Sequence, residues 1–414
     1  MSKDNSFVTM DAINLALPLI AISVVALLLL PAIKESAVWR ASVTPLASII
    51  GSGFLVVAPL LALVVGWAAP LAMLAIVVIA YGLGEISRFN IRHGEPLLQS
   101  GEAPALLMMT ERLANFTLSL AYIVSVAFYI RLLASFIFRG VGLDTAIGAQ
   151  VLTTLILIFI GYTGWRRGLE GLVRAEEYSV SIKLAIIVAL LFGLANYDVS
   201  VDFSIRDFPA PSVSAWEQLC QLAGMLLVVQ GFETSRYLGR EFSAELRIKS
   251  MRFAQIVSGL IYVAFIVLCM PLLLGLKGLS VDETAMIGLS GHIATVLPAM
   301  LVLAAAMSQF SAAVADTAGA GGLVEEESGG RISARYAYVA VIGLGIALVW
   351  MTNVFEIIAL ASRAFAAYYL SQALSAFQIA GHRPEGRSRR VGRIATALAS
   401  VLLVWVVIFA APAE

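Results

Sequence analysis

The sequence predicts an all-α integral membrane protein with about 12 membrane-spanning helices. Hydrophobic residues make up 60% of the 414 residues and charged residues only 13%, and the mean hydropathy is +0.92. Soluble domains carry about 25% charged residues. Many apolar segments are long enough to cross a bilayer, and short loops separate them. Two of these segments are interrupted by glycine near their middle, which is the feature that carries most of the functional interpretation.

Twelve apolar segments are predicted to span the membrane, and the longest loops between them are polar or glycine-rich: 88–108, 196–214 and 313–332. In the last of these, Gly319–Leu323 is predicted to be flexible loop. The predicted spans are residues 11–32, 42–66, 69–87, 109–138, 147–164, 172–195, 215–238, 251–275, 290–313, 333–351, 354–380 and 392–411.

The distribution of Lys and Arg predicts the orientation. One set of alternate loops holds 20 of the 27 basic residues, and the other set holds four. By the positive-inside rule the first set is cytoplasmic, so both termini are predicted to lie outside. The remaining three, Arg131, Lys183 and Arg363, fall within spans. A basic residue at mid-membrane costs about 2.5–3.5 kcal/mol on insertion scales, so each of them requires a partner or a wet cavity.

The first interrupted segment, residues 41–66, has Gly51-Ser52-Gly53 near its midpoint. Glycine in a helix interior costs about 1 kcal/mol relative to alanine, which favours local unwinding. Unwound backbone at membrane depth must be buried in protein or line a cavity, and transporters hold their substrates at such breaks. If the helix restarts here, the N–H groups of Ser52, Gly53 and Phe54 suit an anion such as a carboxylate. The alternative is a small-residue surface that packs against another helix.

The second interruption lies at Gln230-Gly231-Phe232-Glu233, in span 215–238. Each interrupted span opens a set of five, and five is odd, so the second set is predicted to be inverted relative to the first. The predicted units are an extra N-terminal helix and linker at 1–40, repeats at 41–195 and 196–380, and a C-terminal helix at 381–414. Gly231, Phe232 and Glu233 are candidate substrate-binding residues. The alternative is that the span ends early and Glu233 begins a charged loop.

Lys183 lies near the middle of span 172–195 and is a candidate ion-coupling residue. A desolvated lysine can load and release a proton, and its ammonium can occupy the place of a sodium ion. The alternative is a lysine that extends to the membrane interface. Ser308 and Ser311, one turn apart in span 290–313, are candidate hydroxyl partners of the ion-coupling site, although backbone carbonyls can also satisfy them.

Further polar residues within spans have weaker signals. Tyr122 is a candidate substrate-binding residue, whereas Tyr129 is interpreted as an interfacial anchor. Glu356 and Arg363 are seven residues apart and are both expected to face the protein interior. Which of the carboxylates Glu233, Glu356 and Asp316 faces the cavity is left open by the sequence.

Motifs for other functions are not found. HExxH, a P-loop, GxSxG and cysteine–histidine metal spacing are absent from the sequence. We therefore expect a protein that is not an enzyme, without catalytic residues, metal or cofactor, and without a nucleic-acid partner. A channel would need a repeated ring of polar residues along a pore, and a sensor a sizeable soluble domain, and neither is evident.

Four segments together resemble the amino acid–polyamine–organocation (APC) transporters, which share the LeuT-like five-plus-five inverted-repeat fold. GSGF at 51–54 resembles the motif of the family's first helix, and GFE at 231–233 its broken sixth helix. RRGLEGLVRAEEYSVSIKL at 166–184 resembles the linker into its fifth helix, including a lysine that some members use in place of Na⁺, and SQFSAAVADT at 308–317 its eighth helix. The chain departs from the family in its extra helix at 11–32 and in Phe54-Leu55 where the family usually has Ile-Phe.

The resemblance implies alternating-access import of an amino acid or related amine, a small-molecule substrate bound at Gly51, Ser52, Gly53 and Phe54. The amine would meet carbonyls near Gly231. Lys183 would favour coupling to protons or exchange without Na⁺. Another small solute, such as a nucleobase, an organic anion or an inorganic ion, is the alternative substrate. The expected location is the inner (plasma) membrane, crossed several times, with the lipid bilayer as partner and no prediction of oligomeric state.

Overall fold

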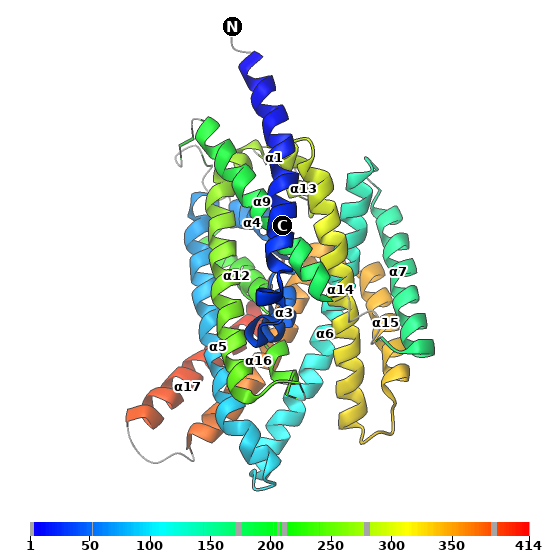
Figure 1. Cartoon of the computed structure of the whole chain (residues 1–414). Helices are drawn as coiled ribbons and strands as arrows, with labels where there is room; N and C mark the ends of the chain where they lie inside the picture. The colour runs from blue at the N-terminus through cyan, green and yellow to red at the C-terminus, as the bar shows by residue number, and fades with distance from the viewer. Residues whose placement is uncertain are drawn as a thin grey trace.

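The computed structural model describes residues 4–413 except 52, 144, 170–175, 202, 205–207, 209–212, 240, 277–281 and 382–386. Within these residues the secondary structure is helical, and no strand is present (Figure 1). The elements are α1 Asp4–Leu28, α2 Pro31–Lys34, α3 Ala37–Ile49, α4 Gly53–Val65, η1 Gly66–Ala68, α5 Ala69–Gln99, α6 Ala105–Gly140, α7 Ala146–Arg167, α9 Glu176–Ser200, α10 Ala215–Met225, η3 Leu226–Val229, α11 Thr234–Tyr237, α12 Ala244–Leu273, η4 Leu274–Leu276, α13 Ala285–Ser290, α14 Leu297–Glu327, α15 Ala334–Met351, α16 Val354–Gly381 and α17 Arg387–Phe409.

The predicted membrane protein with about 12 spans is confirmed. Ten helical runs in the described part are long and apolar enough to cross a membrane. One of them, Gly53–Gln99, contains both α4 and α5, which are separated by a turn at Gly66 with φ +56°. The interrupted α10–η3–α11 segment is too short in each piece to be counted by length. Counting α4 and α5 as two spans and adding the interrupted α10–η3–α11 segment gives the twelve spans that the hydropathy predicts.

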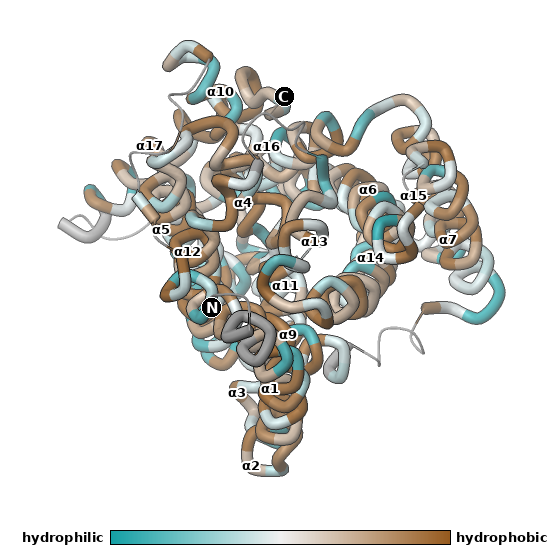
Figure 2. Tube along the Cα trace, turned by 90° about the horizontal axis from the view of Figure 1, so that it is seen from above, coloured by the Kyte–Doolittle hydropathy of each residue, from teal (hydrophilic) through white to brown (hydrophobic). Residues whose placement is uncertain are grey.

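The helices form a central group and an outer layer. Viewed along the bundle, α4, α11 and α13 lie near the middle of the molecule, with α6, α14, α16, α12 and α9 around them (Figure 2). The most extensive packing joins α6 to α14 and α16. The helices α7 and α15 pack together at one edge, and α1 packs on α9 at another. The interrupted helices are therefore enclosed by protein, which is the condition for non-helical backbone at membrane depth.

The two loops predicted at 88–108 and 313–332 are largely helical, so this part of the prediction is wrong. Helix α5 continues to Gln99 and α14 continues to Glu327. The glycines in α14 serve close packing: a Cβ on Gly321 would lie 2.2 Å from Tyr338 Cε1, and one on Gly319 would lie 3.0 Å from Tyr122 Cε2. Small residues allow helices to approach closely in membranes, and this gain outweighs the low helix propensity of glycine.

Two charged residues predicted to face the interior do not. Arg363 is exposed, and its Nε donates to the carbonyl of Ala410 at 2.9 Å. Glu356 is half-buried and caps the start of α16, where its Oε2 accepts from the backbone N–H of Asn353 at 2.8 Å. The reciprocal bond from the Glu356 N–H to Asn353 Oδ1, also 2.8 Å, completes a capping pair. Of the three carboxylates that the sequence left open, Glu356 therefore has a structural role at a helix end.

Candidate functional site

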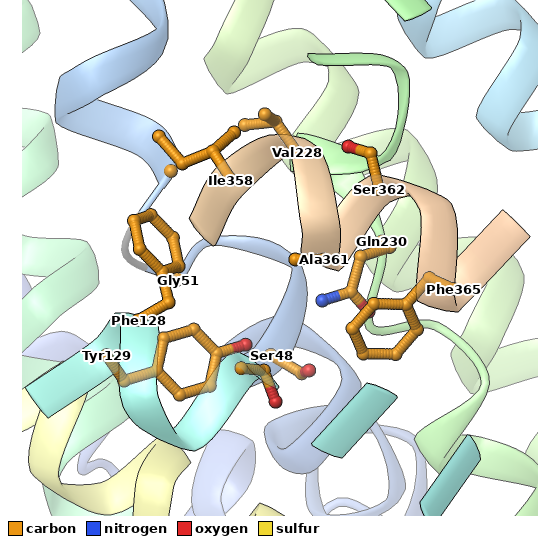
Figure 3. Close-up of a pocket in the computed structure, with 12 residues that line it drawn as sticks. Ser48, Gly51, Phe128, Tyr129, Val228, Gln230, Ile358, Ala361, Ser362 and Phe365 are labelled. Carbon is orange, nitrogen blue, oxygen red and sulfur yellow. The ribbon is translucent and has the colours of Figure 1, made fainter. Parts of the chain in front are cut away.

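A cavity lies where the two interrupted helices meet, near the middle of the molecule (Figure 3). Its volume of about 40 Å³ gives room for about two or three water molecules. Apolar side chains form much of the wall, and five polar side chains interrupt it. The lining residues are Ser48, Gly51, Gly53, Ser125, Phe128, Tyr129, Val228, Gln230, Ile358, Ala361, Ser362 and Phe365.

The first break follows from the glycines in the sequence. Helix α3 ends at Ile49 and α4 begins at Gly53. Ile50 has φ −87° and ψ +59°, outside the helical region. Gly51 and Gly53 line the cavity, and their role in binding substrate stays a prediction. Ser52 lies outside the described residues, so its predicted role stays a prediction.

The second break lies directly against the first. Gly231 has φ +121°, a conformation that residues with a Cβ rarely adopt. A Cβ there would lie 2.6 Å from the backbone carbon of Ser48 in α3, and a Cβ on Gly53 would lie 2.4 Å from Val228 Cγ1 in η3. Each break therefore depends on a glycine that lets the other interrupted helix approach. The sequence shows the glycines, but it cannot show that they face one another.

Glu233 is completely buried, so the alternative that it begins an exposed charged loop does not hold. Its Oε2 accepts from the N–H of Gly231 at 2.9 Å and from the hydroxyl of Tyr369 in α16. Its Oε1 has no hydrogen-bond partner among the described residues. Phe232 stacks on the Tyr369 ring with a centroid distance of 5.0 Å. Glu233 and Phe232 thus fix the second break against Tyr369 of α16. Gln230 is the residue of this segment that lines the cavity.

Two tyrosines of α6 lie at or beside the cavity. Tyr129, interpreted as an interfacial anchor, is 3% exposed and lines the cavity, so that interpretation is wrong. Its hydroxyl and the Gln230 amide point into the space between the two breaks (Figure 3). Tyr122 is buried beside the cavity, with its ring 6.3 Å from that of Phe365. Phe54 packs away from the cavity, against Tyr262 and Phe265.

Lys183 is 4% exposed and does not extend to the membrane interface. Its Nζ donates to the Ala47 carbonyl at 2.8 Å, in the last turns of α3 before the break. It also donates to the Ser308 hydroxyl of α14 at 3.1 Å. The predicted pair of Lys183 and Ser308 is therefore brought together. Ser311 lies one helical turn after Ser308 on α14 and is buried. Its hydroxyl has no hydrogen-bond partner within the described part of the chain.

Asp316 is a second buried carboxylate near the cavity. It lies on α14 and is 5% exposed, and its Oδ2 accepts from the hydroxyl of Ser125, which lines the cavity. A carboxylate within an apolar span signals a functional position. No sequence feature pointed to its partner Ser125, or to Ser48 and Phe365.

Most of the Lys and Arg residues lie at one end of the molecule, the lower end in Figure 1, which we call the basic end. Ion pairs join the helices between the cavity and this end. Arg236 of α11 pairs with Glu111 of α6 at 2.5 Å and donates to Gln372 of α16. Gln372 in turn accepts from Asn90 of α5 at 2.9 Å. Arg247 of α12 pairs with Glu95 of α5 at 2.6 Å. Five helices are thus tied together below the breaks.

We expect Glu111→Ala to loosen this closure, because it leaves the buried Arg236 guanidinium without its ion partner. Breaking a buried pair costs about 3–5 kcal/mol, and the two side chains are 9% and 12% exposed. The melting temperature should fall by several degrees. An Ala361→Cys reporter should be labelled faster by a thiol reagent added from the basic end. Glu102→Ala removes an exposed carboxylate and should change neither, and equal behaviour of the two variants would contradict a closing role.

Comparisons with known proteins identify the family of this chain. A family model described as APC superfamily transporter matches residues 31–410. The chain belongs to the APC superfamily of transporters. An uncharacterized protein from Aquifex aeolicus (strain VF5) is 43% identical over 391 residues, which cover 93% of each chain. The protein is thus a transporter of this superfamily, with a membrane setting and a small-molecule substrate that the family implies.

Two solved structures resemble the fold of this APC superfamily member. A Na⁺-coupled sialic acid symporter in a substrate-bound outward-open state has a TM-score of 0.54 at 13% identity, covering 99% of this chain and 98% of that one. A manganese transporter mutant from Eremococcus coleocola has a TM-score of 0.51 at 10% identity, covering 90% and 86%. At these identities the likeness concerns the fold alone.

Proposed function

We propose that this transporter imports an amino acid or related amine by alternating access and without a requirement for Na⁺. The observation that carries the proposal is the buried Lys183 ammonium, which joins the Ala47 carbonyl beside the first break to the Ser308 hydroxyl. A fixed positive charge there takes the place and the oxygen ligands that a Na⁺ ion would use. Lys183 can also load and release a proton when it is desolvated, which makes protons the candidate coupling ion.

The polar groups around the cavity support a zwitterionic substrate. The start of α4 at Gly53 presents the positive end of a helix dipole, which suits a carboxylate. The end of η3 and Gln230 present oxygens on the opposite wall, and Gln230 Oε1 has no partner among the described residues. The aromatic and aliphatic wall formed by Phe128, Ile358 and Phe365 suits a small apolar side chain. We include Gly51, Gly231, Phe232, Glu233 and Tyr122 in this proposed site as wall or support, and Phe54 as a residue that packs behind the wall. Ser52 is included from its position in the sequence alone.

The arrangement of the breaks supports the two-repeat organisation. Each interrupted segment begins a set of five spans, α3–α9 and α10–α16, and interrupted helices at corresponding positions are typical of inverted repeats. We propose repeats at 41–195 and 196–380, preceded by the extra helix and linker at 1–40 and followed by the C-terminal helix at 381–414. By the positive-inside rule the basic end is cytoplasmic and both termini are outside.

The test is uptake into proteoliposomes of the full-length protein. A panel of labelled amino acids, amines, organic anions and nucleobases is offered with and without Na⁺ and with and without an inward proton gradient. Uptake of an amino acid or amine that persists without Na⁺ supports the proposal. Uptake that strictly requires Na⁺ contradicts the coupling, and uptake only of an organic anion or nucleobase favours the alternative substrate class.

The cavity itself is tested by filling it. Ala361 lines the cavity, so Ala361→Trp is expected to reduce both uptake and thermal stabilisation by the substrate at least about tenfold, since the added ring occupies the space of a bound solute. The neighbouring Leu360 is 36% exposed on the same helix, and Leu360→Trp should leave uptake within about twofold. Equal loss in both variants would place the substrate elsewhere.

A further inference from the structure

A second hollow lies at the molecule's edge, between α5, α12 and α17, outside the proposed transport site. Its volume is about 510 Å³, within the range of pockets that hold ligands. Figures 1 and 2 both show α17 beside α5 and α12 at this edge. Its residues come from the half of α5 near the basic end, the first turns of α12 and the middle of α17. None of its lining residues is shared with the central cavity.

The mouth of this groove is positively charged. Arg88, Arg92 and Arg252 line it, with one carboxylate, Glu85. Glu85 is shared between two of them: it lies 3.0 Å from Arg88 and 3.4 Å from Arg252. Arg88 is buried and is also fixed by Gln255 of α12, whereas Arg92 is exposed. Three guanidinium groups against one carboxylate leave a surplus of positive charge at the mouth.

The rest of the groove is mostly apolar, with His93 and Thr396 as its other polar residues, and it runs away from the charged mouth. Ile79 lies 13 residues before Arg92 on α5, which corresponds to about 20 Å of helix. On the opposite wall Leu402 lies ten residues after Gly392, about 15 Å of α17. Gly82 contributes open space, because a Cβ built on it meets no atom within 4 Å. A basic head and an apolar channel of this length match the shape of one phospholipid.

We propose that this groove binds an anionic phospholipid, with its phosphate at Arg92 and Arg252 and an acyl chain along Ile79, Gly82 and Leu402. The position in the bundle fits this ligand, because the mouth is near the basic end, at the level where the helices leave the apolar part of the bilayer. Basic pockets between membrane helices bind lipid head groups by the same electrostatics. The bound lipid joins α17 to α5 and α12.

The experiment titrates the purified full-length protein in detergent with dioleoyl phosphatidylglycerol or with phosphatidylcholine of the same chains. Lipid binding is followed by native mass spectrometry and by the melting temperature. Glycerol phosphate, which has the anionic group without chains, is the third probe. We expect phosphatidylglycerol to bind more tightly than phosphatidylcholine and glycerol phosphate to give no stabilisation.

Two variants separate the head group from the chain. The double variant Arg92→Gln/Arg252→Gln should weaken phosphatidylglycerol binding about 25-fold, at about fivefold for each basic residue, and should leave phosphatidylcholine unchanged. Gly82→Leu fills the groove without removing charge and should weaken phosphatidylglycerol at least about tenfold. Leucine also favours the helix over glycine, so this variant is expected to fold.

The matched control is Arg166→Gln/Arg167→Gln, which removes two basic residues from the same end of the molecule on α7. It should bind phosphatidylglycerol like the wild type. The proposal is overturned if the control and Arg92→Gln/Arg252→Gln lose equal affinity, if phosphatidylcholine binds as tightly as phosphatidylglycerol, or if glycerol phosphate alone gives the same stabilisation. Binding is measured without transport, so this outcome is independent of the substrate proposal.

Discussion

Replacing Lys183 with alanine is expected to abolish uptake, with a loss of at least about tenfold. The substitution removes the ammonium and leaves the Ala47 carbonyl and the Ser308 hydroxyl without their donor, and each buried group left unpaired costs about 1–3 kcal/mol. Because Ala47 lies next to the first break, the loss also loosens the geometry of the substrate site. Uptake into proteoliposomes and the melting temperature are the two measurements.

The control for this variant is Lys249→Ala, which removes an exposed lysine and should preserve uptake. A further measurement separates ion replacement from simple destabilisation. Na⁺ should not raise the melting temperature of the wild type, because the ammonium already occupies the position. Normal uptake by Lys183→Ala, or stabilisation of the wild type by Na⁺ but not by K⁺ at equal ionic strength, would contradict the proposed role of Lys183.

Gly231→Ala is expected to destabilise the protein by about 2–6 kcal/mol and to stop transport. The φ of +121° is a strained conformation for alanine, at about 1–3 kcal/mol. The new methyl group would also overlap the backbone of Ser48, only 2.6 Å away, and overpacking costs about 1–3 kcal/mol more. The backbone of α3 cannot rotate aside as a flexible side chain can, so the two breaks must separate.

Melting in detergent and the fraction of monodisperse protein measure this effect. Gly343→Ala is the control, since it lies within α15 with no atom within 4 Å of its added Cβ. That variant should be neutral or slightly stabilising, because alanine favours a helix over glycine. A Gly231→Ala protein that melts like the Gly343→Ala protein and retains uptake would show that the close contact between the breaks is not required.

The spans and the breaks were predictable because both are local properties of the chain. Hydropathy over about twenty residues identifies a span, and Gly51 and Gly231 stand out in otherwise apolar helices. The same reasoning failed for the segments 88–108 and 313–332, which are mostly helical. The local sequence around Gly319 and Gly321 predicts a flexible loop, but in the structure the rings of Tyr122 and Tyr338 occupy the space beside these glycines. That information is not in the local sequence.

The candidate site was predictable only in part for the same reason. An ionisable residue within an apolar span is rare and therefore easy to recognise in the sequence. Lys183 and Glu233 could be found for this reason, together with the breaks beside them. The facing residues could not: Ser48, Ser125 and Phe365 are ordinary in their helices. Tyr129 was misread because tyrosine at a membrane interface is common, and only its 3% exposure shows that it faces the cavity.

The sequence by itself determined that this chain crosses a membrane about twelve times and carries two interrupted helices with a lysine in an intervening span. These follow from composition and from residues that are costly where they stand. Only the tertiary structure decided that Gly231 packs on Ser48, that Lys183 donates to Ala47 and Ser308, and that Asp316 pairs with Ser125. Such contacts join residues more than a hundred positions apart, and close packing in three dimensions, rather than local preference, selects them.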